Sequence, residues 1–214
     1  GLNYISHDEE ETKKLLLVRS WRAEGPFDSS YSLAILNRHF VEALNQNIDN
    51  VSLHITEGPG DYDPDISYLE QFSTIHSIYE KSIKIQPIYE VLSRNLYPPR
   101  VDDTNAKYNL LHSYGWEESE FPKHWVDEFN SNLQGITVMS KLVKKILIDN
   151  GVKIPIAVSG LGLDHVDNIK PDYKLNTNAR KYKILHVSSC FERKGIDILL
   201  KAYGNAFTSN DDIS

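Results

Sequence analysis

The run 135-GITVMSKLVKKILIDNGVKIPIAVS-159 contains two strand-like segments with a helix-like segment between them. GITVMS (135–140) and IPIAVS (154–159) are short apolar runs rich in β-branched residues, which is typical of buried strands. Between them, Ser140 is a good N-cap for a helix and Gly151 a good residue to end it. Strand–helix–strand units of this kind build parallel sheets covered by helices. The run therefore predicts an α/β fold.

The same alternation extends along the chain. Further strands are expected at 14–20, 51–55, 88–93, 108–113 and 183–189, and helices from Ser29 or Ser30 onwards, at 66–86, at 122–133 and at 195–207. This order predicts a Rossmann-like parallel sheet with helices on both faces. The expected organisation is a polar leader at 1–13, this domain at 14–166, a linker at 167–182 and the first strand and helix of a second domain at 183–214. We expect the chain to be a piece of a longer polypeptide, with a processed complete protein as the alternative.

Composition narrows the classes of function. The 214 residues carry a net charge of -7, which argues against broad binding to nucleic acid or to an anionic membrane. The single cysteine, Cys190, excludes an intrachain disulfide and a zinc site built from several cysteines. No stretch reaches the ~18 apolar residues that a membrane span needs. The expected location is the cytoplasm, with the inner face of the membrane as a further option for the full-length protein.

Polar clusters follow the predicted strands where each strand ends. They are RAEGPFDSS (22–30), RNLYPPR (94–100), HSYGWEESE (112–120) and SGLGLDH (159–165). Ligands of open parallel sheets bind outside the carboxyl ends of the strands, so we expect a binding site there. The first cluster has one glycine and matches neither glycine-rich phosphate fingerprint, which makes a dinucleotide oxidoreductase a poor interpretation.

Three segments resemble family 4 glycosyltransferases: EGPFDSSYSLA (24–34), the run from 135 to 164, and VSSCFERKGIDILLKAY (187–203). The resemblance implies the GT-B fold, in which two Rossmann-like domains face each other across a cleft. The first domain mainly receives the acceptor, and the second mainly binds the nucleotide-sugar donor. RNLYPPR and HSYGWEE are most similar to mannosyltransferase-like members that build bacterial surface polysaccharides.

The resemblance also implies site residues in the first domain. Gly25 and Ser29 match the loop that lies against the donor phosphate and the acceptor, and Ser30 offers a second hydroxyl. His112 matches the histidine that touches the transferred sugar, which makes it the catalytic candidate. Packing as an ordinary buried histidine is its alternative role.

In the second domain, Lys194 matches the lysine that neutralises the donor diphosphate. The arginine that the family places five residues earlier is absent, since position 189 is serine, and Arg193 is the candidate substitute.

Other residues have two interpretations each. Arg94 and Arg100 could meet an anionic acceptor or be solvated, and Trp116 could stack on a sugar or pack in the core. Glu117 could hold sugar hydroxyls or belong to a solvated acidic face. DYD (61–63) resembles an Asp-x-Asp metal motif, but its surroundings favour a turn in which Asp supplies local backbone hydrogen bonds.

The expected activity is that of a retaining, metal-independent glycosyltransferase. It would move a hexose, with mannose as the leading candidate, from a nucleotide sugar to a growing polysaccharide or lipid-linked glycan, without a cofactor. The chain by itself is expected to be inactive. The alternatives are a nucleotide-sugar epimerase of the same fold and a non-catalytic carbohydrate-binding or scaffolding domain.

Overall fold

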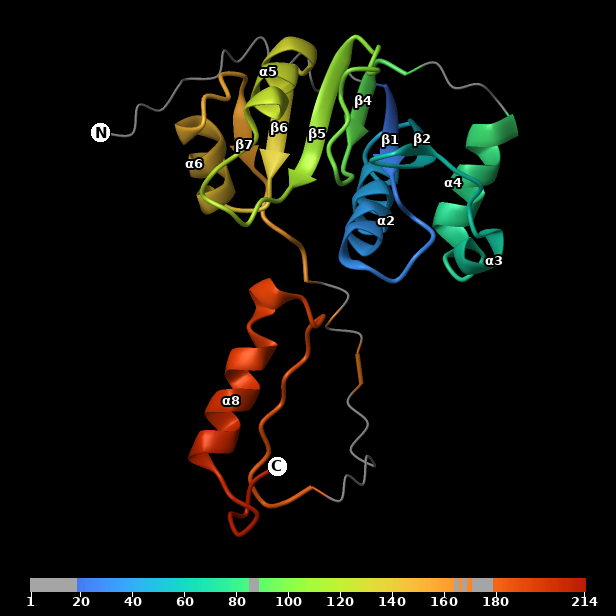
Figure 1. Ribbon diagram of the computed structural model, residues 1–214. Coiled ribbons are helices and arrows are strands. Elements are labelled where there is room, and N and C mark those ends of the chain that lie inside the picture. Colours follow the sequence, from blue (N-terminus) through green and yellow to red (C-terminus); the bar gives the residue numbers. More distant parts are fainter. Residues whose placement is uncertain (1–18, 85–88, 164–165, 167–168, 171–178) are drawn as a thin grey trace. The chain divides into compact units, whose positions relative to one another are not determined.

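A computed structural model describes residues 19–84, 89–163, 166, 169–170 and 179–214. The chain divides into two compact units, Gly1–Gly162 and Leu163–Ser214. The first unit is an α/β domain whose seven-stranded sheet has the order β3-β2-β1-β4-β5-β6-β7 (Figure 1). All neighbouring strands pair in parallel except β2 and β3, which are antiparallel.

The strands of this unit are β1 (Ser20–Gly25), β2 (Asn50–Glu57), β3 (Gly60–Asp61), β4 (Val91–Arg94), β5 (Tyr108–Tyr114), β6 (Gly135–Val138) and β7 (Ile156–Val158). Its helices are α2 (Ser32–Asn45), α3 (Ile66–Leu69), α4 (Ser73–Lys84), α5 (Lys123–Asn132) and α6 (Lys141–Asp149).

Helices cover both faces of the sheet, as predicted. Ala23 of β1 and Leu53 of β2 pack with residues of α2 and α4 in one apolar cluster. Leu111 of β5 and Ile136 of β6 pack with residues of α5 and α6 in a second cluster. Glu24 pairs with Arg94, and Arg94 with Leu111, so Leu111 lies on the face opposite Ala23 because side chains alternate along a strand. The predicted Rossmann-like arrangement is confirmed.

An irregularity in β5 reverses this alternation. The register with β6 shifts between Leu111 and Tyr114, and Ser113 has a φ of 49°, which is uncommon for a residue with a side chain. The Ser113 amide donates a hydrogen bond to Thr137 Oγ1 at 2.8 Å. His112 contacts α2, as regular alternation after Leu111 requires, and the irregularity at Ser113 returns Tyr114 to the cluster under α5.

Two predictions near the N-terminus have different outcomes. Most of the strand expected at 14–20 lies outside the described residues, and β1 occupies Ser20–Gly25, a segment expected to be mostly loop. The first helix was expected to be capped by Ser29 or Ser30, but α2 begins at Ser32 after Tyr31, with no side-chain cap. Composition did not indicate β1, because the strand contains two charged residues, Arg22 and Glu24, and Glu24 also bonds to the distant Arg94.

The other expected elements of the first unit are found, with one division. The region 66–86, expected as a helix, forms α3 and α4 with a break between them. Helix α6 begins as predicted, because Ser140 Oγ accepts a hydrogen bond from the Val143 amide at 3.2 Å. Gly151 follows the helix with a φ of +100°, a conformation that favours glycine.

The second unit contains a 3-10 turn, η1 (Glu192–Lys194), and helix α8 (Ile196–Ala206), which confirms the helix expected at 195–207. The strand expected at 183–189 is wrong, since only an isolated parallel bridge joins Tyr182 to Ile213. Leu185 and Val187 are 86% and 82% exposed, so this segment has no sheet or core to pack against in the described residues. The leader at 1–13 and most of the linker at 167–182 lie outside the described residues. Throughout the described part, no helix has the length and apolar character needed to cross a membrane.

Candidate functional site

The carboxyl end of β1 is built around Gly25. This residue has a φ of +150°, and a Cβ placed on it would lie 2.5 Å from the Asn95 carbonyl oxygen and closer still to Asn37 Nδ2. Both distances are far below van der Waals contact, so no other residue fits without movement of the backbone. Gly25 therefore brings β1, the end of β4 and α2 into close approach, rather than opening a wide phosphate loop.

Asn37, fully buried on α2, connects this glycine to the predicted catalytic residue. Its Nδ2 donates to the carbonyl oxygens of Pro26 and Asn95, each at 3.0 Å. Its Oδ1 lies 3.0 Å from His112 Nε2. One amide thus links the loop after β1, the end of β4 and the end of β5.

His112 lies at the carboxyl end of β5 and is 2% exposed. Its ring stacks on Phe40 of α2, with the centroids 3.9 Å apart and the planes 6° from parallel. Burial lowers the pKa of His112 to about 3, so the imidazole is neutral at physiological pH. His112 Nδ1 is buried and accepts no hydrogen bond from any described residue. The ring is therefore a neutral group enclosed by protein, and one of its nitrogens has unused hydrogen-bonding capacity.

Arg38 of α2 bonds to the backbone of the loop at 26–31. The guanidinium donates to the carbonyl oxygens of Phe27 and Ser29, the second at 2.8 Å, and lies 4.2 Å from the centre of the Phe72 ring. Burial lowers the pKa of Arg38. Ser29 Oγ is buried and without a hydrogen-bond partner among the described residues, whereas Ser30 is exposed. Of the two predicted serines, Ser29 is the one that the loop turns inward.

Two tyrosines on the rim of this loop are bonded to carboxylates. Tyr62 donates its hydroxyl proton to Asp28 Oδ1 at 2.8 Å, and Tyr31 donates to Glu57 Oε1 at 2.6 Å. The Asp65 amide donates to the second oxygen of Asp28 at 2.7 Å. Burial and the adjacent carboxylates raise the pKa of both phenols. No local sequence pattern indicates this rim, because its hydrogen-bond partners are more than 25 residues apart.

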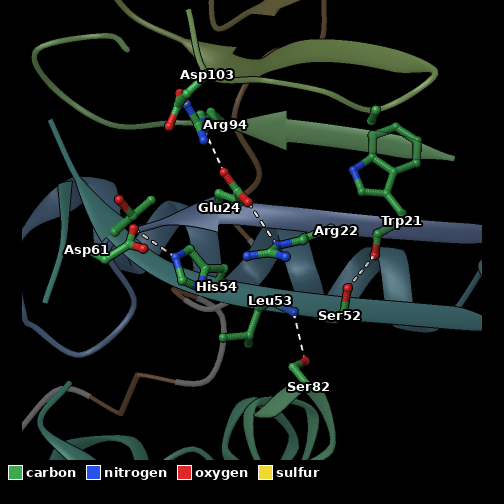
Figure 2. Close-up of polar contacts among 12 residues, drawn as sticks. Trp21, Arg22, Glu24, Ser52, Leu53, His54, Asp61, Ser82, Arg94 and Asp103 are labelled. Carbon is green, nitrogen blue, oxygen red and sulfur yellow. Dashed lines mark hydrogen bonds and ion pairs between the residues drawn. The ribbon is translucent and has the colours of Figure 1, made fainter. Parts of the chain in front are cut away.

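Arg94 belongs to a buried charge network on the face of the sheet away from α2 (Figure 2). Its Nε donates to Glu24 Oε2 at 2.6 Å, and its guanidinium also bonds to Asp103 and to the Arg100 carbonyl oxygen. Glu24 Oε1 lies 2.8 Å from Arg22 Nε. Although burial opposes the charge of Arg94, its bonds to the carboxylates of Asp103 and Glu24 prevail and raise its pKa. The solvated alternative is wrong for Arg94, and its guanidinium is already engaged by protein groups.

The DYD segment joins the same network. Asp61 Oδ1 lies 2.9 Å from His54 Nε2, and the hydrogen bond from His54 lowers the pKa of Asp61 (Figure 2). Arg100 bonds to Thr56 Oγ1 at 2.9 Å and to Asp103 at 2.8 Å. The prediction that the aspartates of this turn bond to local backbone is therefore wrong for Asp61, which bonds to a side chain of the neighbouring strand. No group of three or more potential metal ligands occurs in the described ranges.

The remaining predicted residues lie elsewhere. Trp116 packs at the margin of the cluster under α5, with its ring centroid 4.9 Å from that of Phe121 and its Nε1 donating to the Glu120 carbonyl oxygen at 2.8 Å. Glu117 is exposed. Arg193 and Lys194 form part of η1 in the second unit and are exposed there.

The first unit thus brings Gly25, Ser29 and His112 to one edge, and adds Asn37 and Arg38 from α2, which sequence reasoning missed. A helix asparagine and a helix arginine carry no local motif, so the signal that would have found them is their position on the buried side of α2. No protein-family model, no curated protein and no solved structure matches this chain.

Proposed function

We propose that this chain forms the acceptor-side part of a retaining, metal-independent glycosyltransferase. The full-length enzyme would transfer a hexose, with mannose as the leading candidate, from a nucleotide sugar to a growing glycan. The observation that carries the proposal is the meeting of two features at one carboxyl edge of a parallel sheet. These features are the Gly25 loop before α2 and the neutral, buried His112 with an unpaired Nδ1.

The chemistry of this edge suits a sugar. Sugar hydroxyls donate hydrogen bonds, and an unprotonated imidazole nitrogen accepts them. A neutral ring also adds no positive charge beside the electron-poor sugar carbon that develops during glycosyl transfer. Because the N-cap residue of α2 makes no side-chain hydrogen bond, no cap competes with an anionic group for the first amides, and the helix dipole favours negative charge there.

A transfer assay on the full-length polypeptide tests the proposal. Nucleotide sugars that carry mannose, glucose or galactose are incubated with glycan acceptors, and the products are followed by mass spectrometry. His112→Gln removes the imidazole while keeping a polar side chain of similar reach, and His124→Gln is the matched exposed control. A lost hydrogen bond of about 1.5 kcal/mol corresponds to roughly a tenfold slower transfer.

The expected result is transfer that falls at least about tenfold in His112→Gln and stays unchanged in His124→Gln. Conversion of the nucleotide sugar into its epimer, without transfer, would favour the epimerase. Glycan binding with no turnover of any donor would favour a carbohydrate-binding domain. Either outcome would replace the proposal.

A further inference from the structure

We infer that Asn37 is a positioning residue that holds His112 in a single neutral tautomer, with the proton on Nε2 and the lone pair on Nδ1. This positioning is a property of the protein itself. Its consequence for a ligand, which is selection of a hydroxyl donor, rests on the proposed function.

The orientation of the Asn37 amide follows from its neighbours. The nitrogen faces the carbonyl oxygens of Pro26 and Asn95 at 3.0 Å each, and a carbonyl oxygen can only accept. If the amide were turned over, Oδ1 would face both oxygens with no proton between them. Asn37 must therefore present Oδ1 to His112, and the contact of 3.0 Å requires a proton on Nε2.

The contact between Asn37 and His112 is held in place by the residues packed around it. Gly25 leaves no room for the Asn37 amide to move toward β1, since even a Cβ on Gly25 would overlap it. Stacking on Phe40 sets the plane of the His112 ring. Burial keeps the ring neutral, so protonation of both nitrogens does not compete with the tautomer.

The tautomer of His112 determines which ligand groups can form a hydrogen bond with Nδ1. A buried acceptor without a donor costs about 1–3 kcal/mol, and a hydroxyl that donates to Nδ1 recovers that cost. A phosphate oxygen without a proton has nothing to donate and would meet the nitrogen lone pair. At His112 Nδ1 a sugar hydroxyl is therefore favoured over an unprotonated diphosphate oxygen, and a ligand reaches this buried atom only when neighbouring groups move.

Long-range proton–nitrogen NMR on the chain labelled with ¹⁵N-histidine reads the tautomer directly. The chain has eight histidines, and the His112 signals are assigned as those lost in His112→Gln. The expected pattern is a protonated Nε2 and an unprotonated Nδ1. A protonated Nδ1 in the wild-type protein would overturn the inference, and this reading needs no further variant to fold.

Two substitutions of Asn37 separate positioning from ordinary packing. In Asn37→Asp, the oxygen that replaces Nδ2 faces the carbonyl oxygens of Pro26 and Asn95 and needs a proton to bond to them. The carboxyl is therefore expected to be neutral, to keep its other oxygen toward His112 and to keep the proton on Nε2. Asn37→Leu removes the acceptor, so the tautomers should mix. If Asn37→Leu folds and His112 keeps a single Nε2–H form, Asn37 is not the positioning residue.

A ligand titration adds the functional part. Methyl α-mannoside should shift the Nδ1 resonance, and inorganic pyrophosphate should leave it in place. A response to pyrophosphate alone would overturn the hydroxyl preference. If neither probe shifts Nδ1 while the tautomer is as stated, the hydroxyl selection fails together with the proposed function, and the assignment of Asn37 stands.

Discussion

Replacement of Glu24 by leucine should destabilise the first unit by about 3 kcal/mol. The change removes the carboxylate that lies between Arg22 and Arg94, and Arg94 is 4% exposed. Breaking a buried ion pair from one side typically costs 3–5 kcal/mol, because the remaining charge is left without its partner. The lower end applies here, since Asp103 still bonds to Arg94 and Arg22 is partly exposed.

Urea unfolding followed by tryptophan fluorescence measures this effect in the right part of the chain. All three tryptophans, Trp21, Trp116 and Trp125, lie in the first unit. If the free energy of unfolding falls by about 3 kcal/mol per molar urea, the urea midpoint of Glu24→Leu should be about 1 M lower than that of the wild type. The double variant Glu24→Leu/Arg94→Met should recover much of the loss, because a buried ion pair can be replaced by apolar side chains at little net cost.

The matched control is the exposed ion pair between Lys145 and Asp149 on α6. Lys145→Met should change the free energy of unfolding by no more than about 0.5 kcal/mol, as is usual for a solvated helix pair. Two results would refute the reasoning: a Glu24→Leu variant within about 1 kcal/mol of wild type, or a double variant no more stable than the single one.

Three further predictions follow from the same unit. Lowering the pH from 7 to 5 should reduce the free energy of unfolding of the first unit by about 2 kcal/mol through His112. The unfolded imidazole binds a proton below about pH 6.5, whereas the folded one, with a pKa of about 3, does not. Between these two pH values, the urea midpoint should fall less in His112→Gln than in the wild type. Gly25→Ala should leave little folded protein by circular dichroism, since the added Cβ overlaps Asn37, and a native spectrum would contradict the geometry. Ser140→Ala should cost about 1 kcal/mol in urea unfolding because the Val143 amide loses its cap, and an unchanged midpoint would show that water replaces it.

The parts of the fold that the sequence predicts well are those that depend on neighbours along the chain. The strand, cap, helix and stop between 135 and 159 are set by local periodicity and by Ser140 and Gly151, and the structure contains them. The strand β1 was not predicted, because one of its charges is satisfied far away. Glu24 bonds to Arg94, 70 residues later, and no local pattern indicates such a partner.

The candidate site was predictable only at its strand ends. Gly25, Ser29 and His112 follow strands and could be found from that position, whereas Asn37 is 75 residues from the histidine that it contacts. In the second unit, local composition predicted a strand that the structure does not contain. The sequence at 183–189 has the composition of a buried strand, but Leu185 and Val187 have no neighbouring strand or core in the described residues. Apolar composition alone does not form a strand when no partner is present to pair with it.

The irregularity at Ser113 has a consequence for how this domain could change over evolution or in engineering. The alternation of side chains is interrupted at this residue, so Leu111 and Tyr114 both face the core under α5, whereas His112 between them faces α2. Substitutions that retune the surroundings of His112 need not disturb the packing of Tyr114, and the reverse also holds. One strand thus serves two modules that can vary separately, which leaves the edge next to α2 open to new specificity while the core under α5 stays constant.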